Sequence, residues 1–178
     1  MAAHFERTVA ATDERTAFAR LADRELDRAY RLAAVILGDS AEAQDATHDA
    51  VVAAWRRSGS LHDPDRFEPW FTRILVNTCR DRMRRRRRQP AVEIDLARDI
   101  GAARDAYADV DDRLALDGAF DSLSPDHRVV IVLRFYADLS IDEIAERVGA
   151  PAGTVKSRLH HATRRLHAAL VGEGDLDD

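Results

Sequence analysis

Residues 140–166, SIDEIAERVGAPAGTVKSRLHHATRRL, decide the fold of the C-terminal part of this chain. Ser140 with Glu143 three residues later forms a capping box, so a helix begins there. Gly149 ends this helix, and a second helix begins near Gly153. Apolar residues recur along the second helix at a helical spacing, which predicts a buried stripe of Val155, Leu159, Ala162 and Leu166.

The face opposite this stripe is basic and polar. At about 100° per residue it collects Lys156, Ser157, His160, His161 and Arg164. Residues 147–172 hold five Lys or Arg and no acid. A short turn before such a helix is typical of a helix-turn-helix, which places its second helix in the major groove of DNA. The alternative is an ordinary helical hairpin with a solvated basic face.

The charges of this 178-residue chain are segregated, although its formal net charge is only −5. Residues 80–88 hold seven Arg against one Asp, whereas residues 93–121 hold nine acids against three Arg. The local field, rather than the net charge, guides binding to phosphates, so the acidic average does not exclude a nucleic-acid partner. The many Ala, Leu and Arg and the few Gly and Pro favour an all-α fold.

Several classes of protein are disfavoured by what the sequence lacks. The single cysteine, Cys79, allows neither an internal disulfide nor a Cys-based zinc site, and we expect a buried thiol. We expect no metal, no cofactor and no enzymatic activity, because no phosphate-binding glycine loop or catalytic triad is present. The longest apolar runs are too short for a membrane span and the N-terminus lacks a signal segment, so we expect a cytoplasmic protein without membrane insertion.

Helical periodicity divides the chain into two small helical domains joined by a flexible acidic linker. The first unit, residues 15–90, is predicted to contain three helices, with a boundary at Gly38 between the first two. Residues 91–111 are the predicted linker, and residues 112–172 form the second unit. Residues 129–135, VVIVLRF, have the composition of a strand, but the preceding Ser-Pro cap and the lack of a partner strand predict a helix.

The first unit has two candidate surfaces. On its second helix, predicted over residues 39–57, an acidic face contains Asp45, His48, Asp49 and Val52. Such a face is usually solvated, although an apolar residue among charges suggests a docking surface for a protein. Because Asp45 and Asp49 are predicted to be exposed, we expect their replacement to leave the melting temperature unchanged.

The third helix combines aromatic residues with a run of arginines at residues 84–88. Basic residues stabilise a helix C-terminus, but five in succession favour phosphate contacts. Phe67 and Phe71 suit the core, whereas Trp70 is the best candidate for exposure and for stacking on an unpaired base.

Taken together, the two units resemble the extracytoplasmic-function (ECF) group of bacterial sigma factors, which carry regions 2 and 4 only. The resemblance covers about residues 15–88 and 112–170. It rests on GDSAEAQDATHDAVVAAW and WFTRILVNTCRDRMRRRRR in the first unit and on GTVKSRL after IAERVG in the second. It implies a promoter-specificity factor that binds core RNA polymerase and promoter DNA, with an anti-sigma factor as a further partner.

The resemblance also implies roles for individual residues. The acidic face with Asp45, His48, Asp49 and Val52 would bind polymerase, although the family more often has Gln and Glu at the positions of His48 and Asp49. Leu61 and Asn77 match positions of a pocket for a flipped −10 base, and the −10 element would be bound by Leu61, Trp70, Asn77, Arg80, Arg84 and Arg85. Lys156, Ser157, His160 and His161 match the face that reads the −35 element, although the family often has Arg at the position of His161. Together with Thr154, Arg158 and Arg164 they form the predicted −35 surface.

Two other functions remain compatible with parts of the pattern. A stand-alone helix-turn-helix regulator would be a dimer that binds palindromic DNA without polymerase, but it leaves the aromatic and basic third helix unexplained. A helical adaptor that binds only proteins would have no affinity for DNA at any salt concentration.

Overall fold

The computed structural model describes residues 2–88 and 110–171, and its side chains are described over 15–88 and 116–170. Within these ranges every regular element is helical, which confirms the predicted all-α class. The predicted linker lies outside the described residues except for its last two positions. The helices are α1 (Ala2–Leu37), α2 (Ser40–Arg56), α3 (Phe67–Arg88), α4 (Val110–Ser122), α5 (Pro125–Ile131), α6 (Ile141–Val148) and α7 (Ala152–Val171).

The first unit is a bundle of α1, α2 and α3. Gly38 ends α1 with φ = 71°, a conformation that glycine adopts without steric cost. Asp39 then caps α2 by accepting a hydrogen bond of 2.8 Å from the backbone N–H of Glu42. The buried side of α2 consists largely of small residues, which allow close packing against α1 and α3: Ala43, Ala46, Thr47, Ala50 and Ala54.

Helix α3 carries the aromatic core of this unit. The rings of Phe67 and Phe71 are stacked with centroids 5.5 Å apart, and Phe67 also contacts the ring of Phe18 at 5.8 Å. The core role predicted for Phe67 and Phe71 is therefore confirmed. Cys79 is also fully buried, and burial raises the pKa of its thiol to about 12, so this thiol is unreactive at neutral pH.

The second unit contains the helix-turn-helix. Residues 129–135 are helical, as predicted, and continue from α5 into a π-helical turn, η3 (Val132–Tyr136). Ser140 and Glu143 form the complete capping box of α6, and Gly149 ends it with φ = 64°. Helix α7 packs against α4, α5 and α6, and its buried residues include Val155 and Ala162.

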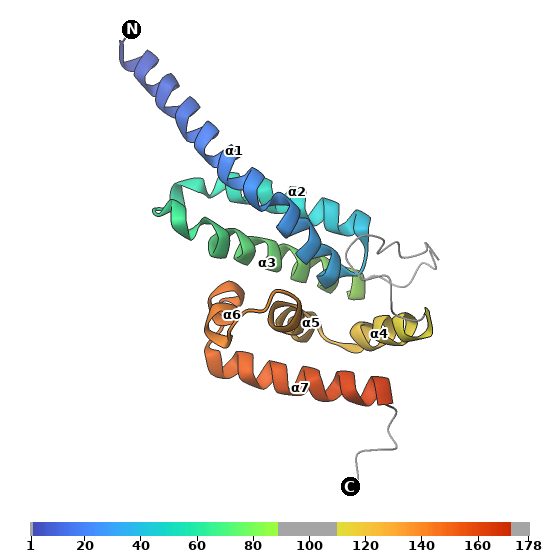
Figure 1. The fold of residues 1–178 in the computed structure, drawn as a ribbon. Helices are drawn as coiled ribbons and strands as arrows, with labels where there is room; N and C mark the ends of the chain where they lie inside the picture. The colour runs from blue at the N-terminus through green and yellow to red at the C-terminus, as the bar shows by residue number, and fades with distance from the viewer. Residues whose placement is uncertain (1, 89–109, 172–178) are drawn as a thin grey trace.

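The two units pack against each other, which the sequence did not predict. Helix α3 contacts α1 and α2 on one side and α5 and α6 on the other, while α7 lies on the side of the second unit that is far from α1 (Figure 1). Two 3₁₀ turns, η1 (Ser58–Ser60) and η2 (Pro64–Arg66), connect α2 to α3. Among the helices of the described residues, none is long and apolar enough to cross a membrane.

Candidate nucleic-acid interface

One face of α3 carries the polar and aromatic residues expected to contact DNA. Residues spaced three or four apart on a helix lie on the same face. Five residues follow this spacing and form what we call the α3 stripe: Trp70, Arg73, Asn77, Arg80 and Arg84. The stripe is oriented toward α5 and α6 of the second unit, because its arginines contact residues there.

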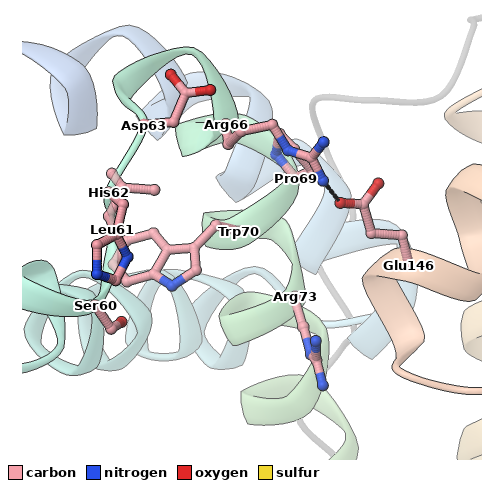
Figure 2. Close-up of a pocket in the computed structure, with 9 residues that line it drawn as sticks. All are labelled: Ser60, Leu61, His62, Asp63, Arg66, Pro69, Trp70, Arg73 and Glu146. Carbon is pink, nitrogen blue, oxygen red and sulfur yellow. Dashed lines mark hydrogen bonds and ion pairs between the residues drawn. The ribbon is translucent and has the colours of Figure 1, made fainter.

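The N-terminal end of the stripe borders a pocket of about 280 Å³, which we call the Trp70 pocket (Figure 2). Leu61 and Trp70 both line it, so the structure brings these two predicted residues together. Asn77 is not among the lining residues and lies two helical turns further along α3, about 10 Å away by helical rise. The remaining lining residues are Ser60, His62, Asp63, Arg66, Pro69, Arg73 and Glu146.

Trp70 is held in a fixed position while part of it stays accessible. Its ring packs on Phe67 with centroids 5.8 Å apart, and the side chain is only half-buried. An indole anchored in the core on one side and open to a pocket on the other is suited to stack on an unpaired base. The exposure predicted for Trp70 is therefore present, but only in part.

The arginines at the C-terminal half of α3 are largely engaged within the chain. Arg80 is buried, and its Nη1 donates to Oδ1 of the exposed Asn77 at 3.2 Å. Arg84 pairs with Asp126 of α5 at 3.1 Å. Arg85 is exposed and donates from Nε to the carbonyl of Asp81 at 3.3 Å. Burial lowers the pKa of Arg80, an effect that the neighbouring Asp126 partly offsets.

The face of α2 that carries Asp45, His48, Asp49 and Val52, which we call the α2 acidic face, is partly neutralised by an arginine that sequence reasoning missed. Arg82 of α3 lies 2.8 Å from Glu42, 2.6 Å from Asp49 and 3.7 Å from Asp45. Burial opposes the charge of Arg82, but the hydrogen bonds to Asp49 and Glu42 outweigh it and raise its pKa. Three carboxylates therefore lie near the guanidinium of Arg82, and Arg85 and Arg86 line the same hollow as Glu42 and Arg82. His48 is also exposed there, and Val52 is half-buried.

The contact with Arg82 corrects one sequence expectation. Asp49 is exposed, as predicted, but its hydrogen bond to Arg82 means that its replacement by arginine must place two cations together. The double replacement of Asp45 and Asp49 by arginine should therefore lower the melting temperature. A signal in the sequence was available: Arg82, with Arg86 one turn later, lies on the side of the arginine-rich helix opposite the α3 stripe.

The predicted −35 surface lies on α7, where we call it the α7 basic face, and it is open to solvent at most of its positions. Arg158 is the exception, because it is half-buried and its Nη1 lies 3.6 Å from Oδ1 of Asp126. The structure thus turns this residue toward α5 rather than toward the open face. The exposed members of the face are Thr154, Lys156, Ser157, His160, His161 and Arg164.

A cluster of histidines adjoins the α7 basic face. The ring of His161 lies 5.6 Å from that of His160 and 6.4 Å from that of His127 in α5. Burial lowers the pKa of His127, and the positive charges of His161 and Arg158 lower it further. His127, which the sequence did not single out, also lines a pocket of about 440 Å³ with His161, Arg164, Arg165, His167 and Ala168.

Comparison with protein families gives a consistent result for both units. The family model described as Sigma-70 region 2 matches residues 21–89, and the one described as Sigma-70, region 4 matches residues 119–168. The ECF RNA polymerase sigma factor SigM of Mycobacterium tuberculosis is 34% identical over 159 residues, which cover 89% of this chain and 79% of SigM. The RNA polymerase sigma factor SigV of Bacillus subtilis is 30% identical over 145 residues, which cover 81% of this chain and 85% of SigV.

Solved structures with a similar fold include two protein complexes. One is the sigma factor RpoE in complex with the anti-sigma factor NepR from Bartonella quintana. It has a TM-score of 0.61 and 25% identity, and the match covers 83% of this chain and 92% of RpoE. The other is CnrH in complex with the cytosolic domain of CnrY, with a TM-score of 0.60 and 28% identity, covering 94% of this chain and 97% of CnrH.

Proposed function

This chain belongs to the ECF group of the sigma-70 family, whose members direct promoter-specific transcription initiation with RNA polymerase, and from that premise we propose how its surfaces divide this work. The family consists of initiation factors without enzymatic activity. A stand-alone regulator or a helical adaptor would not explain the match to Sigma-70 region 2. The proposed division is a polymerase- and −10-binding unit at 15–90, a linker at 91–111 and a −35-binding unit at 112–172.

The α2 acidic face is the proposed docking surface for core RNA polymerase. Asp45 and Asp49 are exposed there, and Val52 supplies a half-buried apolar contact. Arg82 neutralises part of this charge, and the exposed carboxylates of Asp45 and Asp49 suit a basic partner surface. His48 stands on the same face and completes the proposed set.

The α3 stripe and the Trp70 pocket are the proposed surface for the −10 element. The single observation that carries this proposal is that an accessible indole and a row of arginines share one face of one helix. The indole would receive an extruded base, and the arginines would hold the phosphates of the same strand. The contributing residues are Leu61, Trp70, Asn77, Arg80, Arg84 and Arg85.

The α7 basic face is the proposed reader of the −35 duplex. Lys156, Ser157 and His160 are exposed on the first half of the second helix of a helix-turn-helix, where side chains reach base edges. Arg164 lies further along the same face and suits a phosphate contact. Thr154, Arg158 and His161 complete the proposed set, with the side chain of Arg158 having to leave Asp126 before it can contact DNA.

An anti-sigma factor is the proposed regulatory partner, and the cytoplasm is the proposed location. The two solved structures described above are complexes: one with the anti-sigma factor NepR and one with the cytosolic domain of CnrY. These partners belong to those proteins, and they support a partner of the same kind for this chain.

Run-off transcription tests the proposed function. Purified core RNA polymerase of a bacterium would transcribe a library of genomic fragments with and without this protein. We expect discrete transcripts that require the protein and that share two conserved elements upstream of their start sites. Transcripts that are identical in the two reactions would contradict the proposal.

A further inference from the structure

A hollow in the second unit collects basic residues, several of which have no partner within the chain. It has a volume of about 440 Å³ and lies between α5 and α7, which pack against each other (Figure 1). We call it the His127 pocket, after the half-buried residue that α5 contributes. The remaining lining residues all belong to α7: His161, Arg164, Arg165, His167 and Ala168. No carboxylate is among these lining residues, so every polar side chain there is able to carry positive charge.

The helical spacing of α7 brings its lining residues to one side of the helix. Arg164 and Arg165 follow His161 by three and four positions, and Ala168 follows Arg164 by four. Residues at these spacings are neighbours on a helix surface. His127 borders the hollow from α5, and its ring lies 6.4 Å from that of His161 at an interplanar angle of 20°. Basic groups from two helices therefore converge on one concave site.

The two arginines of the His127 pocket are not engaged within the described part of the chain. Arg80, Arg82 and Arg84 of α3 all pair with carboxylates. Arg164 and Arg165 are exposed, and neither pairs with a carboxylate of any residue whose side chain the structure describes. A guanidinium presents its N–H donors in a fixed planar arrangement that matches the oxygens of a phosphate. Both arginines are therefore available to bind an anion.

The surroundings of His127 are positively charged. Burial is the largest cause of the lowered pKa of this imidazole, and three basic residues of α7 lower it further: His161, Arg158 and Arg165. Asp126, beside it on α5, raises the pKa but does not outweigh these effects. The carboxylate of Asp126 pairs instead with arginines outside the pocket, the nearest of which is 2.9 Å away. A bound anion supplies the negative charge that this site lacks.

From this arrangement we propose that the His127 pocket binds the phosphates of a free nucleoside diphosphate or triphosphate. Its volume lies within the range of about 300–1,000 Å³ that is usual for small-molecule sites. Each backbone phosphate of DNA carries a single negative charge, whereas the pocket offers two guanidinium groups and three imidazoles. A terminal phosphate monoester carries about −1.5 to −2 at neutral pH, and the adjoining phosphates of a nucleotide add to this charge. The exposed ring of His161 offers a face on which the base stacks.

Occupation of the pocket competes with −35 DNA, a consequence that rests on the proposed function of the α7 basic face. His161 and Arg164 belong both to that face and to the lining of the pocket. A nucleotide held by these side chains brings its negative charge against the backbone of the duplex. By linkage, the duplex weakens nucleotide binding by the same factor as the nucleotide weakens duplex binding. The pocket thus lets a soluble phosphate compound control the reading of the −35 element.

Isothermal titration calorimetry on the full-length protein tests the site, with adenosine triphosphate as the probe and adenosine as its phosphate-free control. Arg165→Ala is the test variant, because Arg165 lines the pocket and lies outside the proposed −35 set. Arg134→Ala is the matched control, since Arg134 is an exposed arginine of the same unit that does not line the pocket. We expect adenosine triphosphate to bind Arg165→Ala about tenfold to a hundredfold more weakly than the wild type, the usual effect of losing a hydrogen bond to a charged group. Arg134→Ala should stay within about threefold of the wild type, and adenosine should not bind.

Two further measurements locate the bound nucleotide and test the competition. An NMR titration of the His127 imidazole, assigned with His127→Gln, should show that adenosine triphosphate raises the pKa of His127, because a nearby anion favours the charged ring. Fluorescence anisotropy would follow a labelled −35 duplex taken from a promoter found by run-off transcription. Adenosine triphosphate should displace this duplex from the wild type and from Arg134→Ala, but not from Arg165→Ala at the same concentration.

Several results would overturn the nucleotide site. These are no binding of adenosine triphosphate to the wild type, equal losses in folded Arg165→Ala and Arg134→Ala as judged by circular dichroism, and binding that leaves the pKa of His127 unchanged. If the nucleotide does not bind while Arg165→Ala weakens the duplex, a backbone phosphate of DNA occupies the pocket and the free ligand is excluded. Nucleotide binding that depends on Arg165, with no duplex bound by any variant, would support the site and overturn the proposed −35 surface.

Discussion

Asp45→Arg should separate docking to polymerase from folding. The side chain of Asp45 is 72% exposed, and it is 3.7 Å from Arg82, which has two nearer carboxylate partners. An exposed pair of this kind contributes about 0.2–1 kcal/mol. For a chain of this size, about 1 kcal/mol corresponds to a melting temperature lower by about 2–4 °C. The variant should therefore melt within about 4 °C of the wild type.

The same replacement should nearly abolish polymerase binding. Like charges brought together at an interface cost several kcal/mol, and each 1.4 kcal/mol is tenfold in affinity, so we expect binding weaker by at least about a hundredfold. Asp49→Arg should lose docking too. It should also lose about 1.5–3 kcal/mol of stability, the usual contribution of a hydrogen bond to a charged group, because Asp49 lies 2.6 Å from Arg82.

Fluorescence titration with core RNA polymerase and thermal melting measure the two effects. Gln44→Arg is the control, since Gln44 is exposed on the same helix and outside the proposed docking set. It should bind polymerase within about threefold of the wild type, a change of less than 1 kcal/mol. Wild-type affinity of Asp45→Arg would refute the docking assignment and would leave the α2 acidic face as solvated surface.

Three further predictions concern the DNA-binding surfaces and pH. Trp70→Ala should remove about 1–3 kcal/mol of base stacking and reduce permanganate reactivity at the −10 element. Asn77→Ala should relax the base preference at one −10 position while polymerase still binds. Permanganate footprints that match the wild type in both variants would contradict both roles. Lys156→Ala or Arg164→Ala should weaken duplex binding by about 1–3 kcal/mol if a base contact is lost, or reduce the salt slope by about one if a phosphate contact is lost. The pKa of His127 is lowered in the folded state. Its contribution to stability is therefore complete above about pH 6.5, the pKa in the unfolded chain, and declines as the pH falls toward the pKa in the folded state. On acidification, the melting temperature of His127→Gln should therefore fall less than that of the wild type.

The helix-turn-helix was predictable because its signals are local. Ser140 and Glu143 lie one turn apart, and Gly149 ends the helix through its own backbone conformation. The amphipathic stripe of α7 likewise depends only on a spacing along one helix. Residues that cap a helix or face a core along one element can therefore be identified before any tertiary arrangement is known.

The contacts between the units were not predictable, because they join residues far apart in the sequence. Glu68 and Arg147 are separated by 79 positions, and nothing in either segment identifies the other as its partner. The pairing of Arg82 with Glu42 was unpredictable for the same reason, because it depends on how α3 packs against α2. Sequence reasoning assigned the charges of α2 and α3 to external partners, whereas the structure pairs many of them within the chain.

The placement of Asn77 shows a related limit. The resemblance grouped it with Leu61, but α3 carries it two turns beyond Trp70 and outside the lining of the Trp70 pocket. A resemblance identifies which positions take part, whereas the helical rise decides how far apart they lie. In its proposed −10 role, the α3 stripe would therefore contact successive nucleotides of a DNA strand rather than surround a single base.

Position-specific crosslinking in a complete initiation complex tests the central assignment most directly. A benzophenone amino acid would replace Arg73, on the α3 stripe, in one protein and Lys156, on the α7 basic face, in another. After assembly with core RNA polymerase on a promoter found by run-off transcription, irradiation should link position 73 to a strand of the −10 element and position 156 to the −35 duplex. Crosslinks from position 73 to protein alone, or to DNA outside the −10 element, would contradict the account.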